Sequence, residues 1–252
     1  MINYFTLIKN RYSISFCVPG ILLALFLGAC NGIENKGYVN IEEKVNNATF
    51  VGSASCIECH QEEYNLWQNS HHDQAMKIAD STTILADFNN TTFTYKGVKS
   101  SFSRRGKDYY VNTQGEDGAY ADYKIIYTFG YTPLQQYIVQ FPNGEYNCLL
   151  TAWDTLEEKW FHLQPDLDIK HDEWINWCGG SQRWNTMCAD CHSTKLQKNY
   201  DESKGLFNTT FSEINVACEA CHGPSSSHVS YFKKQEENEA SGILPPELYM
   251  GT

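Results

Sequence analysis

Three short motifs in this chain combine a pair of cysteines with an adjacent histidine. They are Cys56-x-x-Cys59-His60, Cys188-x-x-Cys191-His192 and Cys218-x-x-Cys221-His222. Two thiols at this spacing can form thioethers to the vinyl groups of one porphyrin, and the next imidazole can bind the porphyrin iron. A random chain of this composition would contain roughly 0.01 such motifs. The sequence therefore predicts three covalently bound haem c groups.

Two other kinds of site also use paired cysteines. A thioredoxin-type redox pair needs a βαβ context, and zinc sites usually join two such pairs into one tetrahedral set. Neither explains why a histidine follows all three pairs. Haem attachment is the interpretation that explains both cysteines and the histidine of every motif.

The first 29 residues have the pattern of an export signal. Lys9 and Arg11 give a positive start, and residues 21–27 form an apolar core that is short for a membrane span. The core ends in Leu-Gly-Ala before Cys30, which resembles the lipobox of bacterial lipoproteins. We expect Cys30 to become the lipidated first residue of an exported, periplasm-facing or outer-membrane lipoprotein. Cleavage at an ordinary signal site, with Cys30 incidental, is the alternative.

Charge limits the partners. The formal net charge is −11, and removal of residues 1–29 would make the chain more acidic. No basic patch is present to neutralise phosphates, so nucleic acid is not an expected partner. An acidic surface can instead steer a basic redox protein, or it can serve solubility alone.

Two further cysteines fall outside the motifs and the signal. Cys148 and Cys178 could pair as a disulfide in an exported chain, although the sequence does not show whether their Cα atoms are close enough. The sequence leaves this pairing open.

Hydrophobic spacing separates the chain into helical and extended regions. Tyr64, Trp67, His71 and Ile78 fall on one helical stripe after the first motif. On such a helix His60 and His71 would be separated by roughly 16 Å of rise, so they could not bind the same iron. Residues 91–163 contain several β-branched or aromatic runs, and Asn143-Gly144 predicts a hairpin turn.

These patterns predict an α+β, mostly helical multihaem protein with a small antiparallel β module between haem 1 and haems 2 and 3. The expected organisation is a signal peptide (1–29), a lipidated tether (30–50), a first haem-binding segment (51–90), the β module (91–163), a two-haem segment (164–230) and a C-terminal tail (231–252).

Residues around the motifs carry a family resemblance. Trp67-x-x-Ser70-x-His72, Asn185-Thr186-Met187 before Cys188, and Gly223-Pro224-x-Ser226-x-His228 after His222 resemble exported multihaem cytochromes of the cytochrome c-554 type. The chain is most similar to the branch that carries tetratricopeptide repeats after its haem domain. Members of that branch are usually longer, with further haem motifs, so we expect a truncated product, a fragment or one half of a split gene.

The resemblance implies bis-histidine ligation of many haems. It makes His60, His192 and His222 proximal ligands, and His72 and His228 distal ones. His71 remains the alternative to His72 because it shares the helical face of Trp67. A third distal ligand is His162 or His171, or is absent.

His162 is preferred to His171 because it lies at the end of a predicted strand, beside Trp160 and Phe161. His171 lies in a polar stretch, where an exposed histidine needs no function.

A haem with two histidine ligands has no free iron position, so it transfers electrons without binding a substrate. The expected function is electron transfer between redox partners, such as donor and acceptor cytochromes or a quinol-linked complex, by a membrane-anchored lipoprotein. The alternative is a multihaem oxidoreductase, in which one open-coordinate haem acts on a small nitrogen or sulfur compound. A carrier is favoured over an enzyme.

Overall fold

A computed structural model describes residues 48–238. The predicted signal peptide, Cys30, most of the tether and residues 239–252 lie outside the described residues. No helix within residues 48–238 is long and apolar enough to cross a membrane.

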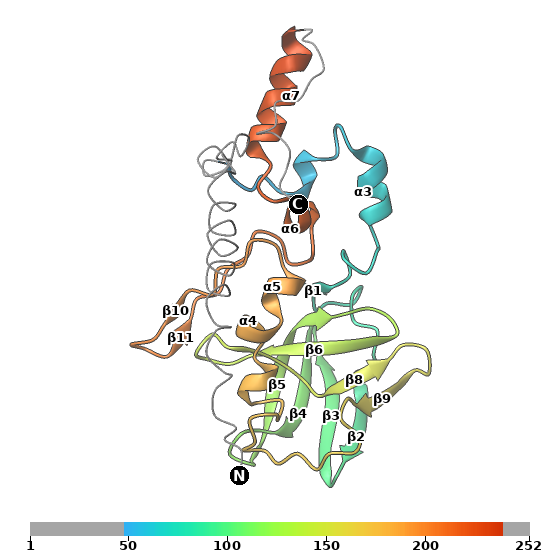
Figure 1. Ribbon diagram of the computed structural model, residues 1–252. Helices are drawn as coiled ribbons and strands as arrows, with labels where there is room; N and C mark the ends of the chain where they lie inside the picture. Colours follow the sequence, from blue (N-terminus) through green and yellow to red (C-terminus); the bar gives the residue numbers. More distant parts are fainter. Residues whose placement is uncertain (1–47, 239–252) are drawn as a thin grey trace, which may run out of the picture. The chain divides into compact units, whose positions relative to one another are not determined.

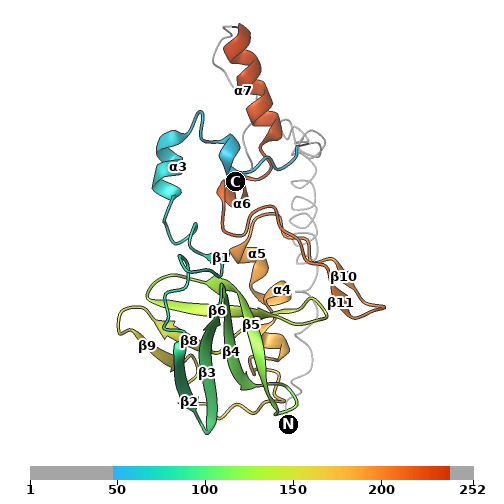
Figure 2. The ribbon, with the colours of Figure 1, turned by 180° about the vertical axis from the view of Figure 1, so that it is seen from behind.

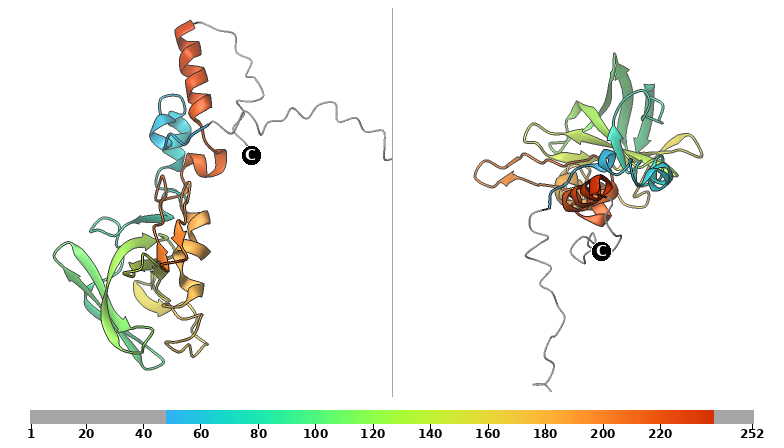
Figure 3. Two further views of the ribbon diagram at one scale, coloured as in Figure 1. Left: turned by 90° about the vertical axis from the view of Figure 1, so that its left-hand side faces the viewer. Right: turned by 90° about the horizontal axis from the view of Figure 1, so that it is seen from above.

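The dominant element is a nine-stranded, nearly closed antiparallel sheet (Figure 1). Its strands follow the order β2-β3-β4-β5-β6-β8-β9, with β1 paired to β5 and β7 paired to β6. The bounds are β1 (Met76–Ile78), β2 (Asn89–Tyr95), β3 (Val98–Arg105), β4 (Asp108–Gln114), β5 (Tyr120–Phe129), β6 (Leu134–Gln140), β7 (Tyr146–Cys148), β8 (Thr151–Asp154) and β9 (Lys159–His162). The curl of the sheet can be followed in Figure 3.

Two side-chain contacts join the end strands β2 and β9. The rings of Tyr95 and His162 stack with centres 3.6 Å apart. The indole N–H of Trp160 donates a hydrogen bond to Oγ1 of Thr91 at 3.2 Å. These contacts bring the two edge strands together without a continuous hydrogen-bonded ladder.

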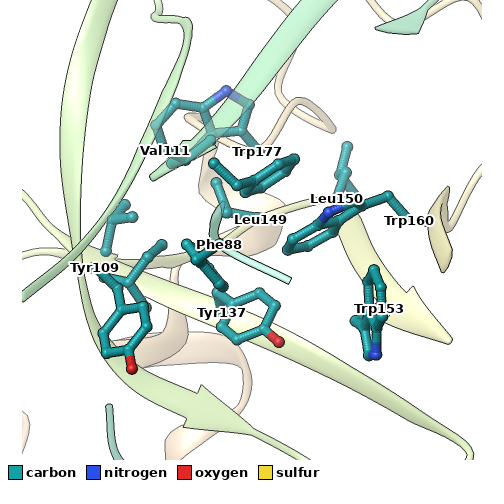
Figure 4. Close-up of a cluster of buried hydrophobic side chains, with 12 residues drawn as sticks. Phe88, Tyr109, Val111, Tyr137, Leu149, Leu150, Trp153, Trp160 and Trp177 are labelled. Carbon is teal, nitrogen blue, oxygen red and sulfur yellow. The ribbon is translucent and has the colours of Figure 1, made fainter. Parts of the chain in front are cut away.

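The interior of the sheet is filled with aromatic side chains (Figure 4). Phe88 lies at its centre and makes edge-to-face contacts with Phe102, Tyr109, Tyr137 and Trp160. Such contacts add to the free energy gained by burying the rings. The aromatic residues of this region therefore form the core of the predicted antiparallel sheet.

The remaining elements are short. Besides two 3-10 turns (Ser53–Ser55 and Gly180–Gln182), they are α3 (Gln61–Trp67), α4 (Trp184–Met187), α5 (Ala189–His192), α6 (Cys218–His222), α7 (Ser226–Asn238) and the hairpin β10 (Tyr200–Asp201) to β11 (Leu206–Phe207). The prediction of a mostly helical protein with a small β module is therefore wrong. The sheet is the main folded element, because its aromatic interior forms a core of its own.

The helix predicted through Ile78 is wrong beyond Trp67. Gln68 is extended, and Asn69 has a positive φ of 61°. Ile78 lies in β1, where it pairs with Tyr127 of β5. Pairing with the sheet therefore overrides the helical spacing of the apolar residues.

A second buried cluster attaches the helices of the second motif to the sheet. Met76 of β1, Ile138 of β6 and Cys148 of β7 pack there with Trp184 of α4 and Ala189 of α5. Figures 1 and 2 show α4 and α5 lying beside β6. The sheet thus provides the rigid support for the second motif.

Candidate functional site

Each of the three motifs forms a single helical turn. In the first, the backbone N–H of His60 donates to the carbonyl of Cys56 at 2.9 Å. The second motif spans the junction of α4 and α5, and the third is α6 itself. Residues three and four apart share a face of such a turn, so both thiols and the imidazole can meet one ligand.

The cysteines of the motifs show a regular pattern of exposure. The first cysteine of each motif is half-buried, whereas the second is exposed in all three: Cys59, Cys191 and Cys221. Free cysteine is among the residues most often buried in folded proteins. Three exposed thiols next to three histidines are the surface that covalently attached porphyrins would cover. The residues present therefore fit haem c.

His60 and His228 face each other across a pocket of about 330 Å³. Their ring centres are 6.2 Å apart and their planes differ by 28°. A metal–imidazole bond is about 2 Å long, so two imidazoles on opposite sides of one metal have ring centres about 6 Å apart. Cys56 and Cys59 also line the pocket, and Phe232 packs on the ring of His228 with centres 4.8 Å apart.

A buried carboxylate ties the first motif to the third. Glu219, only 2% exposed, accepts hydrogen bonds from the backbone N–H groups of Val51, Gly52 and Ser225 and from the Ser225 hydroxyl. Burial raises the pKa of Glu219, but the hydrogen bonds outweigh it and leave that pKa below its ordinary value. Figures 1 and 2 show the segment before α3 beside α6 and the start of α7.

Within this arrangement the first thiols of the two motifs meet. Cys56 and Cys218 lie within hydrogen-bonding distance of each other, and burial together with this neighbour raises the pKa of Cys56 to about 11. The backbone N–H of Cys218 also donates to Oγ of Ser53 at 3.3 Å.

Thr194 and Glu213 connect the second motif to the same region. Buried Thr194 accepts a hydrogen bond from the N–H of Ala217, the residue before α6, and donates to the carbonyl of Asn215. The Glu213 carboxylate accepts from the N–H of Ser53, while its carbonyl accepts from the N–H of Thr194. Hydrogen bonds between residues next to the motifs therefore join the three segments that carry them.

Comparison with known proteins agrees with this geometry. A model of the family described as "Cytochrome c554 and c-prime" matches residues 55–101 and 151–223, and the matched segments contain all three motifs. The chain is a multihaem cytochrome of the c554 type. The family resemblance is thereby confirmed, and with it covalent binding of haem c.

Residues 102–150 of the cytochrome lie between the matched segments and include β4, β5, β6 and β7. Among solved structures, the outer cell wall cytochrome OcwA aligns with 78% of the cytochrome at 18% identity and a TM-score of 0.47. The alignment spans 35% of OcwA, so the cytochrome covers about a third of that chain. No curated protein matches the cytochrome.

The second motif of the cytochrome has an aromatic neighbour. The ring of His192 lies 4.4 Å from that of Phe129, measured between centres. Its Nδ1 is buried and has no hydrogen-bond partner among the described residues. Burial lowers the pKa of His192, which favours the neutral imidazole that a metal requires.

The predicted distal ligands differ in their surroundings. The loop that carries His71 and His72 is held near the third motif, because the N–H of Val216 donates to the carbonyl of His72 and the Trp67 indole donates to the carbonyl of Val216. Both imidazoles are exposed, and the structure does not choose between them.

The side chains of His162 and His171 contact residues of the sheet and its connecting loops. Besides stacking on Tyr95, His162 accepts a hydrogen bond at Nδ1 from the N–H of Gln164. Nδ1 of His171 is 2.7 Å from the carbonyl of Glu116. The structure shows neither histidine facing a motif, so ligation by His162 stays a prediction.

Cys148 and Cys178 are both free thiols rather than a disulfide. Cys178 packs against the aromatic interior of the sheet, whereas Cys148 lies in the cluster that supports the second motif.

Glu219, Glu213 and Thr194 position the motifs, but their sequence context does not predict this role. The only available signal was an acidic residue inside the third motif, and the partners of all three residues are distant in sequence.

Proposed function

We propose that the chain is an electron carrier with three haem c groups, attached through the six motif cysteines and bound at iron by His60, His192 and His222. The opposed rings of His60 and His228 are the observation that carries the proposal. Bound haem supplies reversible one-electron chemistry at iron, and the polypeptide sets the reduction potential through ligands, burial and charge.

His60 and His228 would together hold one iron, and two histidine ligands would leave no place on it for a substrate. Nδ1 of His60 lies 3.9 Å from the carboxylate of Glu63, which would leave Nε2 for the metal. A carboxylate near the outer nitrogen of a ligating histidine fixes its orientation and raises its basicity. This arrangement favours electron transfer over catalysis at the first motif.

The joined motifs support a direct route for electrons. The Cys56–Cys218 contact puts attachment points for the first and third haems next to each other. The Thr194–Ala217 hydrogen bond places the second motif next to the third. Electrons could therefore pass among the three haems without leaving the protein.

One observation favours a second candidate function. The ring contact of His192 is with Phe129, not with a histidine. If His72 or His162 does not complete the second haem, its iron has an open position and could act on a small nitrogen or sulfur compound. Carbon monoxide distinguishes the two functions, because only an open-coordinate haem binds it.

Export and anchoring are also proposed. The apolar segment ending in Cys30 supports a lipidated, membrane-held protein facing the periplasm or the outer membrane. A Cys30→Ala variant should leave the membrane fraction and should no longer incorporate labelled fatty acid. Retention of the variant in the membrane fraction would contradict lipid anchoring.

The expected partners are basic redox proteins. Glu58, Glu62 and Glu63 are exposed around the first motif, and Lys233 pairs with Glu58 at 2.8 Å. Two acidic side chains therefore remain beside the proposed site of the first haem, where they could steer a cationic partner.

Haem content tests the proposal as a whole. Protein exported by a cell competent in cytochrome maturation should contain three haems by pyridine haemochrome assay, with all six motif cysteines modified in peptide mass spectra. Unmodified thiols at these positions would refute it.

A further inference from the structure

Cys148 is a buried thiol that the haem motifs do not use. It lies at the end of β7, is 2% exposed and packs beside Met76, Ile138 and Trp184. Its Cα partner across the ladder is Ile138 of β6. The sheet therefore holds Cys148 in one place.

The neighbour of this thiol is the first cysteine of the second motif. Cys188 packs against the cluster that contains Cys148, and the two sulfurs lie within hydrogen-bonding distance. The hydrogen bond lowers the pKa of Cys188 against the opposing effect of burial. The same hydrogen bond, followed by burial, raises the pKa of Cys148 well above its ordinary value.

Several contacts fix the two backbones beside each other. The N–H of Tyr146 donates to Oδ1 of Asn185 at 2.7 Å, and Arg183 forms an ion pair with Glu145 at 2.5 Å. Asn147 forms an isolated antiparallel bridge with Arg183. These residues directly precede Cys148 and Cys188, so they hold the backbones of the two cysteines beside each other.

We propose that Cys148 is a redox modification site, whose thiol forms a disulfide with Cys188 in chains that have not yet received haem at the second motif. The inference rests on the proposed attachment of haem to Cys188. While the disulfide persists, Cys188 cannot form its thioether, so loading of the second motif requires a thiol reductant. The first and third motifs remain free to load.

The chemistry needs an external disulfide, such as oxidised glutathione. The Cys188 thiolate attacks one sulfur of that disulfide and releases one thiol, which leaves a mixed disulfide on Cys188. The Cys148 thiol then loses its proton, attacks Sγ of Cys188 and releases the second thiol. Two protein thiols are oxidised and one external disulfide is reduced to two thiols. The lowered pKa of Cys188 suits it to the first attack.

Peptide mapping of the full-length chain tests the proposal. The chain is exported by cells competent in cytochrome maturation while haem supply is limited, free thiols are blocked, and peptides are analysed without reduction. We expect a cross-linked peptide joining Cys148 to Cys188, found only in chains without haem at the second motif. Addition of reductant before blocking should remove it.

Two variants and one control complete the test. Cys148→Ala and Cys148→Ser should both lose the cross-link and raise haem occupancy of the second motif above wild type under haem limitation. Cys178→Ala removes the other cysteine that lies outside the motifs within residues 48–238, and it should match wild type. The serine variant nearly preserves side-chain volume, so agreement between the two variants excludes an effect of packing alone.

The proposal is overturned if Cys188 is found cross-linked only to Cys191, if no cross-link forms, or if neither Cys148 variant raises occupancy. Haem occupancy of the first and third motifs separates this failure from failure of the proposed function. Chains that load those two motifs are cytochromes whatever the state of Cys148.

Discussion

The imidazole rings of His60 and His228 lie opposite each other, 6.2 Å apart between centres and 28° from parallel. His60 precedes the first residue of α3, and His228 lies in the first turn of α7. Glu219 helps to bring the two rings together, because it binds the segment before the first motif and the turn before α7. The separation is the one expected for two imidazoles that would hold one metal between them.

Replacement of His228 by methionine should change one haem and leave the others unchanged. Methionine in place of the second histidine raises the reduction potential of a c-type haem. We therefore expect one component of a redox titration to move to higher potential, with a matching change in the visible and near-infrared spectrum. If every haem kept its spectrum and potential, His228 would be removed from the set of ligands.

His171→Met is a matched control for that experiment. It makes the same chemical change at a histidine whose Nδ1 is bonded to the carbonyl of Glu116 and whose ring packs near Gly118. The control should keep the wild-type haem spectra. His162→Met, measured alongside, tests another of the predicted distal ligands directly.

Glu219→Gln should destabilise the protein by about 2–3 kcal/mol, the range for loss of hydrogen bonds to a buried charged group. The amide retains one acceptor oxygen but turns a donor towards the backbone N–H groups of Val51, Gly52 or Ser225. Urea unfolding followed by haem absorbance and by far-ultraviolet circular dichroism measures the change. Glu202→Gln, at an exposed position in the turn between β10 and β11, should have almost no effect. Equal stability of the two variants would contradict the role given to Glu219.

The same carboxylate predicts a dependence of stability on pH. Because the pKa of Glu219 is lower in the folded than in the unfolded chain, its stabilising effect is present above the ordinary glutamate pKa of about 4.3. The effect is lost as pH falls from that value through the lowered one. In this window wild type should lose more unfolding free energy than Glu219→Gln, so the two curves should converge at low pH. Parallel curves would show that Glu219 does not titrate in this way.

The sequence shows the three motifs directly, but its patterns underestimated the extent of the sheet. Runs such as Asp108–Asn112 are rich in tyrosine and valine and do form strands, here within β4. Strand β3 was missed because its sequence is rich in serine and arginine. In the structure Ser100 is buried and its hydroxyl lies 2.8 Å from that of Thr113, so the inner face of this strand includes a polar pair that hydrophobic patterning does not reveal.

The other features that the sequence did not predict depend on contacts between residues distant in the chain. The apolar spacing after the first motif predicted a helix through Ile78. Ile78 instead pairs with Tyr127 of β5, and no local sequence pattern reveals that pairing. Glu219 binds Gly52 across 167 positions of sequence. The spacing within a motif follows from local chemistry, whereas the joining of motifs depends on tertiary hydrogen bonds.

Thr194→Val should loosen the junction between the second and third motifs. The substitution keeps the branched shape but removes the hydroxyl that accepts from Ala217 and donates to Asn215. We expect a loss of about 1–3 kcal/mol, because buried polar groups on both partners lose their hydrogen bonds. Ser212→Ala removes a part-buried hydroxyl that donates to the carbonyl of Thr194 itself and should cost less. Urea unfolding midpoints show which of the two variants loses more stability. A larger loss in Ser212→Ala would show that the Thr194 hydroxyl does not stabilise the contact between the second and third motifs.

Electron exchange at the first motif should depend on local charge. Glu62 is exposed in the first turn of α3 and makes no contact with His60, unlike Glu63, so its charge can be reversed without disturbing that ligand. We expect Glu62→Lys to slow reaction of the reduced protein with hexaammineruthenium(III) and to speed reaction with ferricyanide, because the two oxidants carry opposite charges.

Glu202→Lys makes the same change of net charge on the β10–β11 turn and should have a smaller effect on both rates. In stopped-flow measurements the rates of the variants and of wild type should converge as ionic strength rises. Exposed charges more than about 8–10 Å apart are screened at physiological salt. Equal effects of the two substitutions at low salt would mean that net charge alone, and not an acidic surface beside the first motif, governs the approach of a redox partner.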